Sequence, residues 1–235
     1  MGKTIEYSNP LVADKAKDKS QMYGPEDSRA WIAYDSGLTR TNFGFRNVIK
    51  ALGFPSLQDI RDSLSQPNRS STGLELAGQG RIFQELDLEG VACCLAFPKY
   101  LIEPQDSQTL PIRKKSNGHQ TKVALVSGDL AIASTFRQIL SRFEAEKIPR
   151  PNLLLLTPAG GTNCLPREQA FIDKIIAPAL ALCDPESFIF LGDAPDGSEQ
   201  FLGNFLDAVR ADYEAQAVLG KCGDSPIFGI YKKPA

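Results

Sequence analysis

Small and polar residues directly follow short apolar runs at several places in the chain, and these are the residues that could do chemistry. Ser36-Gly37 follows residues 31–34, and Ser127-Gly128-Asp129 follows residues 122–126. A glycine at the end of a strand lets the backbone turn sharply and lets a ligand approach it closely. The free N–H groups that begin the next helix would then bind an anionic or polar ligand group.

Two later apolar runs end in the same way. Residues 153–156 lead into Thr157 and the Gly160-Gly161 pair, and residues 188–191 lead into Asp193. Because the carboxyl ends of parallel strands lie at one edge of a sheet, we predict that these loops surround one concavity. The predicted cofactor-binding residues are Ser36, Gly37, Gly128, Asp129, Thr157, Gly160, Gly161 and Asp193.

Each of these loops also has a purely structural interpretation. A strand-to-helix turn needs small residues whether or not a ligand binds, and Asp129 beside a helix start complements the helix dipole. Asp196 or Ser198 is predicted to cap the helix that starts near Glu199. The role of Asp193 stays open, because a carboxylate there suits a ligand hydroxyl or Mg²⁺ as well as a cap.

The residue content argues against several well-marked chemistries. The only histidine, His119, lies in a polar stretch, so a Ser-His-Asp triad is disfavoured. The chain has no GxSxG, Walker A, HExxH or GxGxxG sequence. Its five cysteines form no CxxC pair, which argues against a zinc site, and no residue is assigned as a metal ligand.

Charge and composition are typical of a cytoplasmic globular protein. The 235 residues include 26 basic and 28 acidic ones, a net charge of −2 that gives no overall field for nucleic-acid phosphates. The best candidate for a local basic patch is Arg113, Lys114, Lys115 and Lys122, which is interpreted as a solvated loop in preference to a nucleic-acid contact. No stretch approaches the roughly 18 apolar residues needed to span a bilayer, so we expect no membrane partner.

The first half of the chain is expected to hold an arm and the beginning of a domain. Residues 1–27 are polar with little periodicity and are predicted to be a flexible arm, followed by one α/β domain over residues 28–235. Within that domain, the patterns predict strands, helices and loops as follows: strands at 31–34 and 91–97, helices at 41–52 and from Ser56, a polar loop at 66–80, and a domain boundary or long surface loop at 103–121.

From residue 122 onward the pattern is regular. Expected strands are 122–126, 153–156 and 188–191, each followed by an expected helix, namely 132–145, 167–182 and 199–213. Residues 217–219 and 226–231 flank a Gly-containing turn and are predicted to form an antiparallel hairpin. The predicted fold is therefore α/β and Rossmann-like, with a mainly parallel sheet, helices on both faces and a C-terminal antiparallel hairpin. Its predicted core includes Leu125, Leu154, Leu155, Ile189 and Phe190.

Two segments of the chain echo each other. Ser36-Gly37 precedes Phe45-Arg46 as Ser127-Gly128 precedes Phe136-Arg137, at a constant offset (127 − 36 = 91 and 137 − 46 = 91). In each segment an expected apolar strand is followed by Ser-Gly, a loop, Phe-Arg and an expected apolar helix. An internal duplication and the common outline of any two strand-helix units both predict this pattern.

Residues 152–233 resemble the carboxyl-terminal half of AdoMet-dependent methyltransferases of the Rossmann-like superfamily, particularly the RNA 2′-O-methyltransferase branch. The resemblance lies in the order of elements and covers about a third of the 235 residues. The Lys-Asp-Lys-Glu tetrad of that branch is not matched: Thr157 stands near the aspartate position, Gly192 or Asp193 near the second lysine, and Ser225 or Pro226 near the glutamate.

The resemblance implies an adenine-containing small-molecule ligand, with S-adenosylmethionine as the expected cofactor. It predicts a methyltransferase-like protein that is divergent or catalytically degenerate, with an unknown acceptor. The Gly-rich cofactor loop would fall at residues 35–39, which contain one glycine. The alternative is a non-catalytic nucleotide-binding or protein-interaction module on the same fold.

Overall fold

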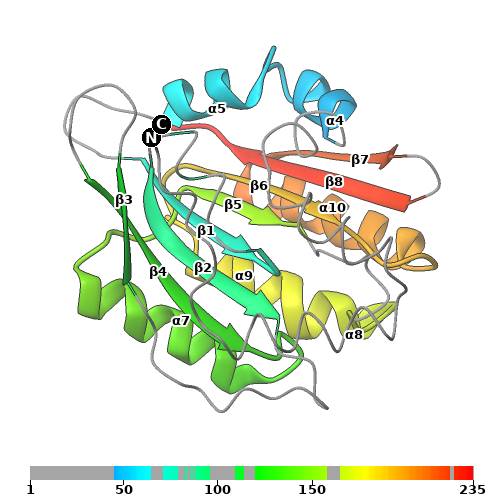
Figure 1. Ribbon diagram of the computed structural model, residues 1–235. Coiled ribbons are helices and arrows are strands. Elements are labelled where there is room, and N and C mark those ends of the chain that lie inside the picture. Colours follow the sequence, from blue (N-terminus) through cyan, green and yellow to red (C-terminus); the bar gives the residue numbers. More distant parts are fainter. Residues whose placement is uncertain are drawn as a thin grey trace, which may run out of the picture.

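The computed structural model describes residues 45–64, 71–78, 83, 86, 88–95, 109–113, 120–157, 165–222 and 225–234. Its centre is a sheet of eight described strands: β1 (Thr72–Leu76), β2 (Glu89–Leu95), β3 (Thr109–Arg113), β4 (Gln120–Gly128), β5 (Leu153–Leu156), β6 (Phe188–Asp193), β7 (Gln216–Cys222) and β8 (Ser225–Lys232). The strands lie side by side in the order β3-β4-β2-β1-β5-β6-β8-β7 (Figure 1).

The middle of the sheet is parallel. Strands β4, β2, β1, β5 and β6 pair with their neighbours in parallel, whereas β3 and β8 pair antiparallel with β4 and β6. Counted along the chain, the five parallel strands have the order 3-2-1-4-5, as in a doubly wound Rossmann sheet. The strand order reverses between β1 and β5, and in such sheets a ligand binds beyond the carboxyl ends of the strands at this switch point.

Helices cover both faces of the sheet (Figure 1). One face carries the longer helices: α7 (Ala133–Glu146), α10 (Glu199–Tyr213), and a continuous helical segment made of α8 (Gln169–Phe171), the π-helical turn η3 (Ile172–Ile176) and α9 (Ala177–Leu182). The other face carries α4 (Arg46–Ala51) and α5 (Leu57–Leu64). The two faces have separate hydrophobic clusters.

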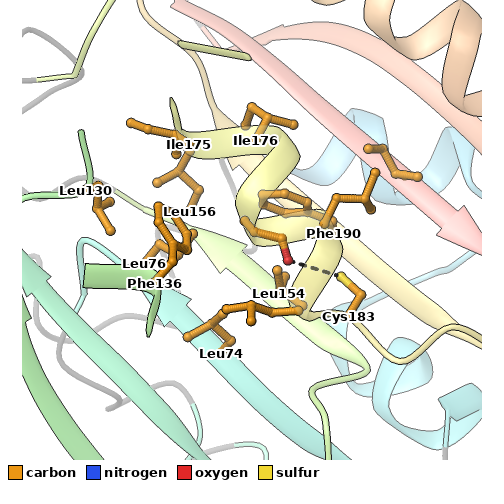
Figure 2. Packing of buried hydrophobic residues seen from close by; sticks show 14 of the residues in the cluster. Leu74, Leu76, Leu130, Phe136, Leu154, Leu156, Ile175, Ile176, Cys183 and Phe190 are labelled. Carbon is orange, nitrogen blue, oxygen red and sulfur yellow. Dashed lines mark hydrogen bonds between the residues drawn. The ribbon is translucent and has the colours of Figure 1, made fainter. Parts of the chain in front are cut away.

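Strand β5 shows how the sequence makes these two clusters. Successive side chains of a strand point to opposite faces. Leu154 and Leu156 belong to the cluster under α7, α9 and α10, while Leu153 and Leu155 belong to the cluster under α4 and α5. A continuous run of leucines is therefore what a strand covered on both faces requires. Figure 2 shows Leu154 and Leu156 packed near Leu74, Leu76, Phe136 and Phe190.

The predicted fold class is confirmed. The expected strand at 153–156 and helix at 199–213 have the predicted bounds, and Ile227 to Tyr231 pairs antiparallel with β6 as expected. The predicted core residues Leu154, Leu155, Ile189 and Phe190 are fully buried, and Leu125 is partly buried against the cluster that contains Leu155 and Ile189. The expected strand at 31–34, the arm at 1–27 and Ser36-Gly37 of the internal echo lie outside the described residues, whereas Phe45-Arg46 of the echo stands at the start of α4.

The prediction of a loop over residues 66–80 was wrong, because Thr72–Leu76 is β1, the central strand of the parallel sheet. Its polar first residue is satisfied by distant partners: the Thr72 N–H donates to Asn152 Oδ1 (2.9 Å) and the Thr72 hydroxyl donates to the Arg150 carbonyl (2.8 Å). These contacts join residues about 80 positions apart, so local composition does not reveal the strand.

The interpretation of residues 103–121 as a linker or long loop also needs correction. Thr109–Arg113 forms β3, which pairs antiparallel with β4 at the outer edge of the sheet. Proline cannot donate a backbone hydrogen bond, so Pro111 argues for a loop in most contexts but is accepted in an edge strand.

Candidate functional site

The switch point of the sheet holds a buried carboxyl group, Glu75. It lies near the carboxyl end of β1, opposite Ala92 of β2 and Leu155 of β5, and only 7% of its surface is exposed. The hydroxyl of Thr157, directly after β5, donates a hydrogen bond to Glu75 Oε1 (3.1 Å). The Thr157 N–H also donates to the Leu76 carbonyl (3.1 Å). Two hydrogen bonds from one residue therefore bridge β5 to β1 where the strand order reverses.

The turn after β1 is tightly folded against this carboxyl group. Ala77 has a φ of 63°, in the left-handed region that a non-glycine residue rarely adopts. A Cβ atom added to Gly78 would overlap the Glu75 carboxyl group. An alanine at this position would force the Glu75 side chain to move, because the backbone of the turn runs directly past it. Left-handed backbone at a non-glycine residue is concentrated at binding sites and turns.

The turn after β4, by contrast, satisfies its own polar groups. Asp129 Oδ1 accepts a hydrogen bond from the Ala131 N–H (2.8 Å), and the Asp129 carbonyl accepts one from the buried Thr135 hydroxyl (2.6 Å). A Cβ atom at Gly128 would lie 2.5 Å from Thr135 Cγ2. The polar atoms of Asp129 named here thus shape the start of α7, as its structural interpretation predicts.

The loop after β6 corrects the predicted helix cap. Ser198 precedes α10, but neither its side chain nor any other in the described residues forms a cap hydrogen bond there. The fully buried Ser198 hydroxyl instead accepts a hydrogen bond from the Glu168 N–H (3.0 Å), at the start of α8. Glu168 has a φ of 56° and a ψ of −137°, an unfavourable conformation for a non-glycine residue that this long-range bond supports.

The described members of the predicted site lie along one edge of the sheet. Gly128 ends β4 and Asp129 follows it, Thr157 follows β5, and Asp193 ends β6. Adjacent strands are about 4.8 Å apart, so β4 and β6, four steps apart in this sheet, are separated by roughly 19 Å. Only Thr157 lies at the switch point itself. Ser36, Gly37, Gly160 and Gly161 lie outside the described residues, and a single shared concavity stays a prediction.

Sequence reasoning missed three residues of the central turn: Glu75, Ala77 and Gly78. The sequence pattern that could have identified them is the alternation of apolar and polar residues in Leu74-Glu75-Leu76, followed by the small residues of Ala77-Gly78-Gln79-Gly80. This is the same arrangement of strand followed by small residues that identified the other loops. The strand was not predicted because the neighbouring residues are rich in Gly and Ser, which favours a loop.

Two titratable groups with a raised pKa, Cys183 and Tyr231, lie outside the turns described above. Among the described residues, no three His, Cys, Asp or Glu side chains are grouped so as to hold a metal ion. Burial raises the pKa of the Cys183 thiol well above its ordinary value, against smaller opposing effects of a backbone hydrogen bond and Arg150. Its Sγ donates to the Ala179 carbonyl inside the core (Figure 2). Burial also raises the pKa of Tyr231, in β8.

Comparison with known proteins gives a likeness in structure alone. No protein-family model and no curated protein sequence matches the chain. The structure is similar to an O-methyltransferase family protein from Burkholderia thailandensis, with a TM-score of 0.41 and 13% identity over 89% of this chain. It is also similar to a candidate caffeoyl-CoA O-methyltransferase from Staphylococcus aureus, with a TM-score of 0.36 and 11% identity over 80% of this chain and 90% of that one.

The matched region spans 61% of the Burkholderia protein. Both TM-scores are below 0.5, so the fold assignment rests on strand order and strand direction. These define an α/β protein with a Rossmann-like doubly wound sheet, closed on one side by an antiparallel hairpin. No helix in the described parts of the chain is long and apolar enough to cross a membrane.

Proposed function

We propose that this chain is a methyltransferase-like protein that binds S-adenosylmethionine across the β1/β5 switch point. The observation that carries the proposal is the buried Glu75 carboxyl group, hydrogen-bonded to Thr157 beside a tight, glycine-containing turn. Open α/β sheets bind their ligands at this place. Buried ionisable groups in such positions are concentrated at functional sites.

The carboxyl group discriminates between the two main ligand classes of this fold. A dinucleotide brings its pyrophosphate to the turn after the first strand. A carboxylate beside that turn would repel phosphate, and the repulsion would be strong where water is excluded. S-adenosylmethionine has no phosphate and carries an ammonium and a sulfonium, which a carboxylate attracts. The absence of a GxGxxG sequence supports the same choice.

The residues of the switch point would hold the cofactor rather than act on the acceptor. Glu75 would bind the ammonium of the methionyl part of the cofactor. The turn at Ala77-Gly78 would lie close to the same part of the cofactor. The bound cofactor supplies an electrophilic methyl group. Gly128 and Asp129, two strands away from β1, and Asp193, two strands away on the other side, are proposed to line the periphery of the same crevice.

A non-catalytic version of the same site is the second candidate. The observation that favours it is Thr157, which stands near the position of a catalytic aspartate in the RNA methyltransferase branch and is used in the structure to hold Glu75. The protein would then bind the cofactor without transferring its methyl group. On the same interpretation we propose that the binding partner is a small adenine-containing ligand and that the protein is cytoplasmic.

Thermal unfolding with candidate ligands tests the proposed function. S-adenosylmethionine and S-adenosylhomocysteine are expected to raise the free energy of unfolding by roughly 2.7 kcal/mol at 100 times their Kd, whereas NAD and ATP are expected to have no effect. Glu75→Gln should remove most of the stabilisation, and Thr135→Val, in the turn after β4, should retain it. Stabilisation by NAD or ATP but not by S-adenosylmethionine would contradict the proposal.

A further inference from the structure

We propose that Thr157 is a positioning residue that makes the site select ligands bearing an ammonium group. The inference rests on the proposed function and deepens it, because it assigns the discrimination between an aminoacyl ligand and a plain nucleoside to one hydroxyl. Thr157 touches Glu75 and acts through it.

A hydrogen bond to β1 holds the backbone of Thr157 in place. Its N–H bonds to the carbonyl of Leu76, one residue past Glu75 on the neighbouring strand. Thr157 is 96% buried and is β-branched, so its side chain has few rotamers available. The hydroxyl is therefore presented to β1 in one place, and Glu75 Oε1 lies 3.1 Å from it.

The Glu75 side chain is confined on a second side by the turn after β1. The space beside the Gly78 α-carbon is filled by the Glu75 carboxyl group, which an added Cβ would overlap. With Gly78 on one side and the Thr157 hydroxyl on another, the carboxyl group has a defined position at the carboxyl edge of the sheet. The Thr157 hydroxyl donates directionally and therefore helps to hold the carboxyl group in this position.

The Thr157 bond is compatible with a ligand bond to the same group. A carboxylate offers about four acceptor positions, so a ligand ammonium can be bound while Thr157 still donates to Oε1. Hydrogen bonds that involve a charged group are among the stronger ones, and their strength depends on geometry. Loss of the Thr157 hydroxyl should therefore weaken binding of the ammonium and leave binding of the nucleoside part unchanged.

The test compares two ligands that differ in the amino-acid part. S-adenosylhomocysteine carries the ammonium, and 5′-methylthioadenosine shares its adenosine and thioether but lacks it. By calorimetric titration of the full chain, Thr157→Val is expected to weaken S-adenosylhomocysteine binding about tenfold, the equivalent of about 1.4 kcal/mol, and to leave methylthioadenosine binding unchanged. Thr157→Ser, which restores the hydroxyl, should bind both ligands within about twofold of the wild type.

A second pair of variants separates positioning from folding. Glu75→Gln should show the same selective loss, and adding Thr157→Val to it should produce little further loss, because both changes act on one interaction. Equal weakening of both ligands by Thr157→Val, or no weakening of either, would overturn the inference while leaving the proposed function intact. A wild-type chain that binds neither S-adenosylmethionine nor S-adenosylhomocysteine would overturn both.

Discussion

Two buried threonines stand at two turns of the same sheet edge and use their hydroxyls differently. Thr135 donates to the carbonyl of Asp129, six residues earlier, and completes the turn that starts α7. Thr157 donates to the Glu75 side chain, 82 residues earlier, and joins two strands at the switch point. A local bond of the first kind builds a turn. A long-range bond of the second kind holds a buried carboxyl group at the switch point, the place where open α/β sheets bind their ligands.

The largest expected effect comes from Gly78→Ala, which changes the space occupied by the Glu75 carboxyl group at the switch point. The added methyl group overlaps the Glu75 carboxyl group, so we expect a loss of about 1 to 3 kcal/mol in the free energy of unfolding and a marked loss of S-adenosylmethionine binding. Urea denaturation and calorimetric titration measure the two effects. Gly203→Ala, in α10 with open space around its α-carbon, is the matched control and should be neutral or stabilising. Unchanged ligand binding in Gly78→Ala would separate this turn from the site.

Thr135→Val should affect stability without affecting binding. The valine preserves the shape but leaves the Asp129 carbonyl without its 2.6 Å partner, so the free energy of unfolding should fall by about 1 to 2 kcal/mol. S-adenosylhomocysteine affinity, measured on the folded variant, should remain that of the wild type. A selective loss of affinity here, comparable to that of Thr157→Val, would remove the distinction between the two threonines.

Asp129 gives the smallest expected effect. Asparagine keeps an oxygen that can accept from the Ala131 N–H, so Asp129→Asn should change the free energy of unfolding by less than about 0.5 kcal/mol, whereas Asp129→Ala should cost about 1 kcal/mol. Chemical denaturation of the two variants side by side measures the difference. If Asp129→Asn abolished cofactor binding while leaving stability unchanged, the Asp129 carboxylate would be a main ligand contact, in contradiction to the peripheral position proposed for it.

The same distinction explains what could be predicted from the sequence. β5, β6 and α10 are apolar or periodic runs between turn residues, so local patterns located them. β1 was missed because it lies in a stretch rich in Ser, Gly, Asn and Gln, because Gly73 is unfavourable inside a strand, and because Glu75 is an unusual residue for a buried strand. Its position is determined by β2 and β5, which pair with it from distant parts of the chain.

The site was predictable to a similar extent. Thr157 was identified because it directly follows a recognisable strand, but its partner was not, since the bond between them spans 82 residues. Asp196 and Ser198 were expected to cap α10 from their positions in the sequence, yet Ser198 bonds to the start of α8. The local sequence therefore identifies candidate residues, but whether their side chains bond locally or to distant residues depends on tertiary contacts.

Hydrogen exchange with and without S-adenosylhomocysteine tests the central claim most directly, because it locates the ligand without a mutation. The account predicts that saturating ligand slows amide exchange in the peptides that contain residues 76–78 and Thr157, on either side of the switch point, and leaves the β7–β8 hairpin unchanged. Protection confined to the hairpin or to other segments away from β1 and β5, or no protection at any ligand concentration, would contradict it.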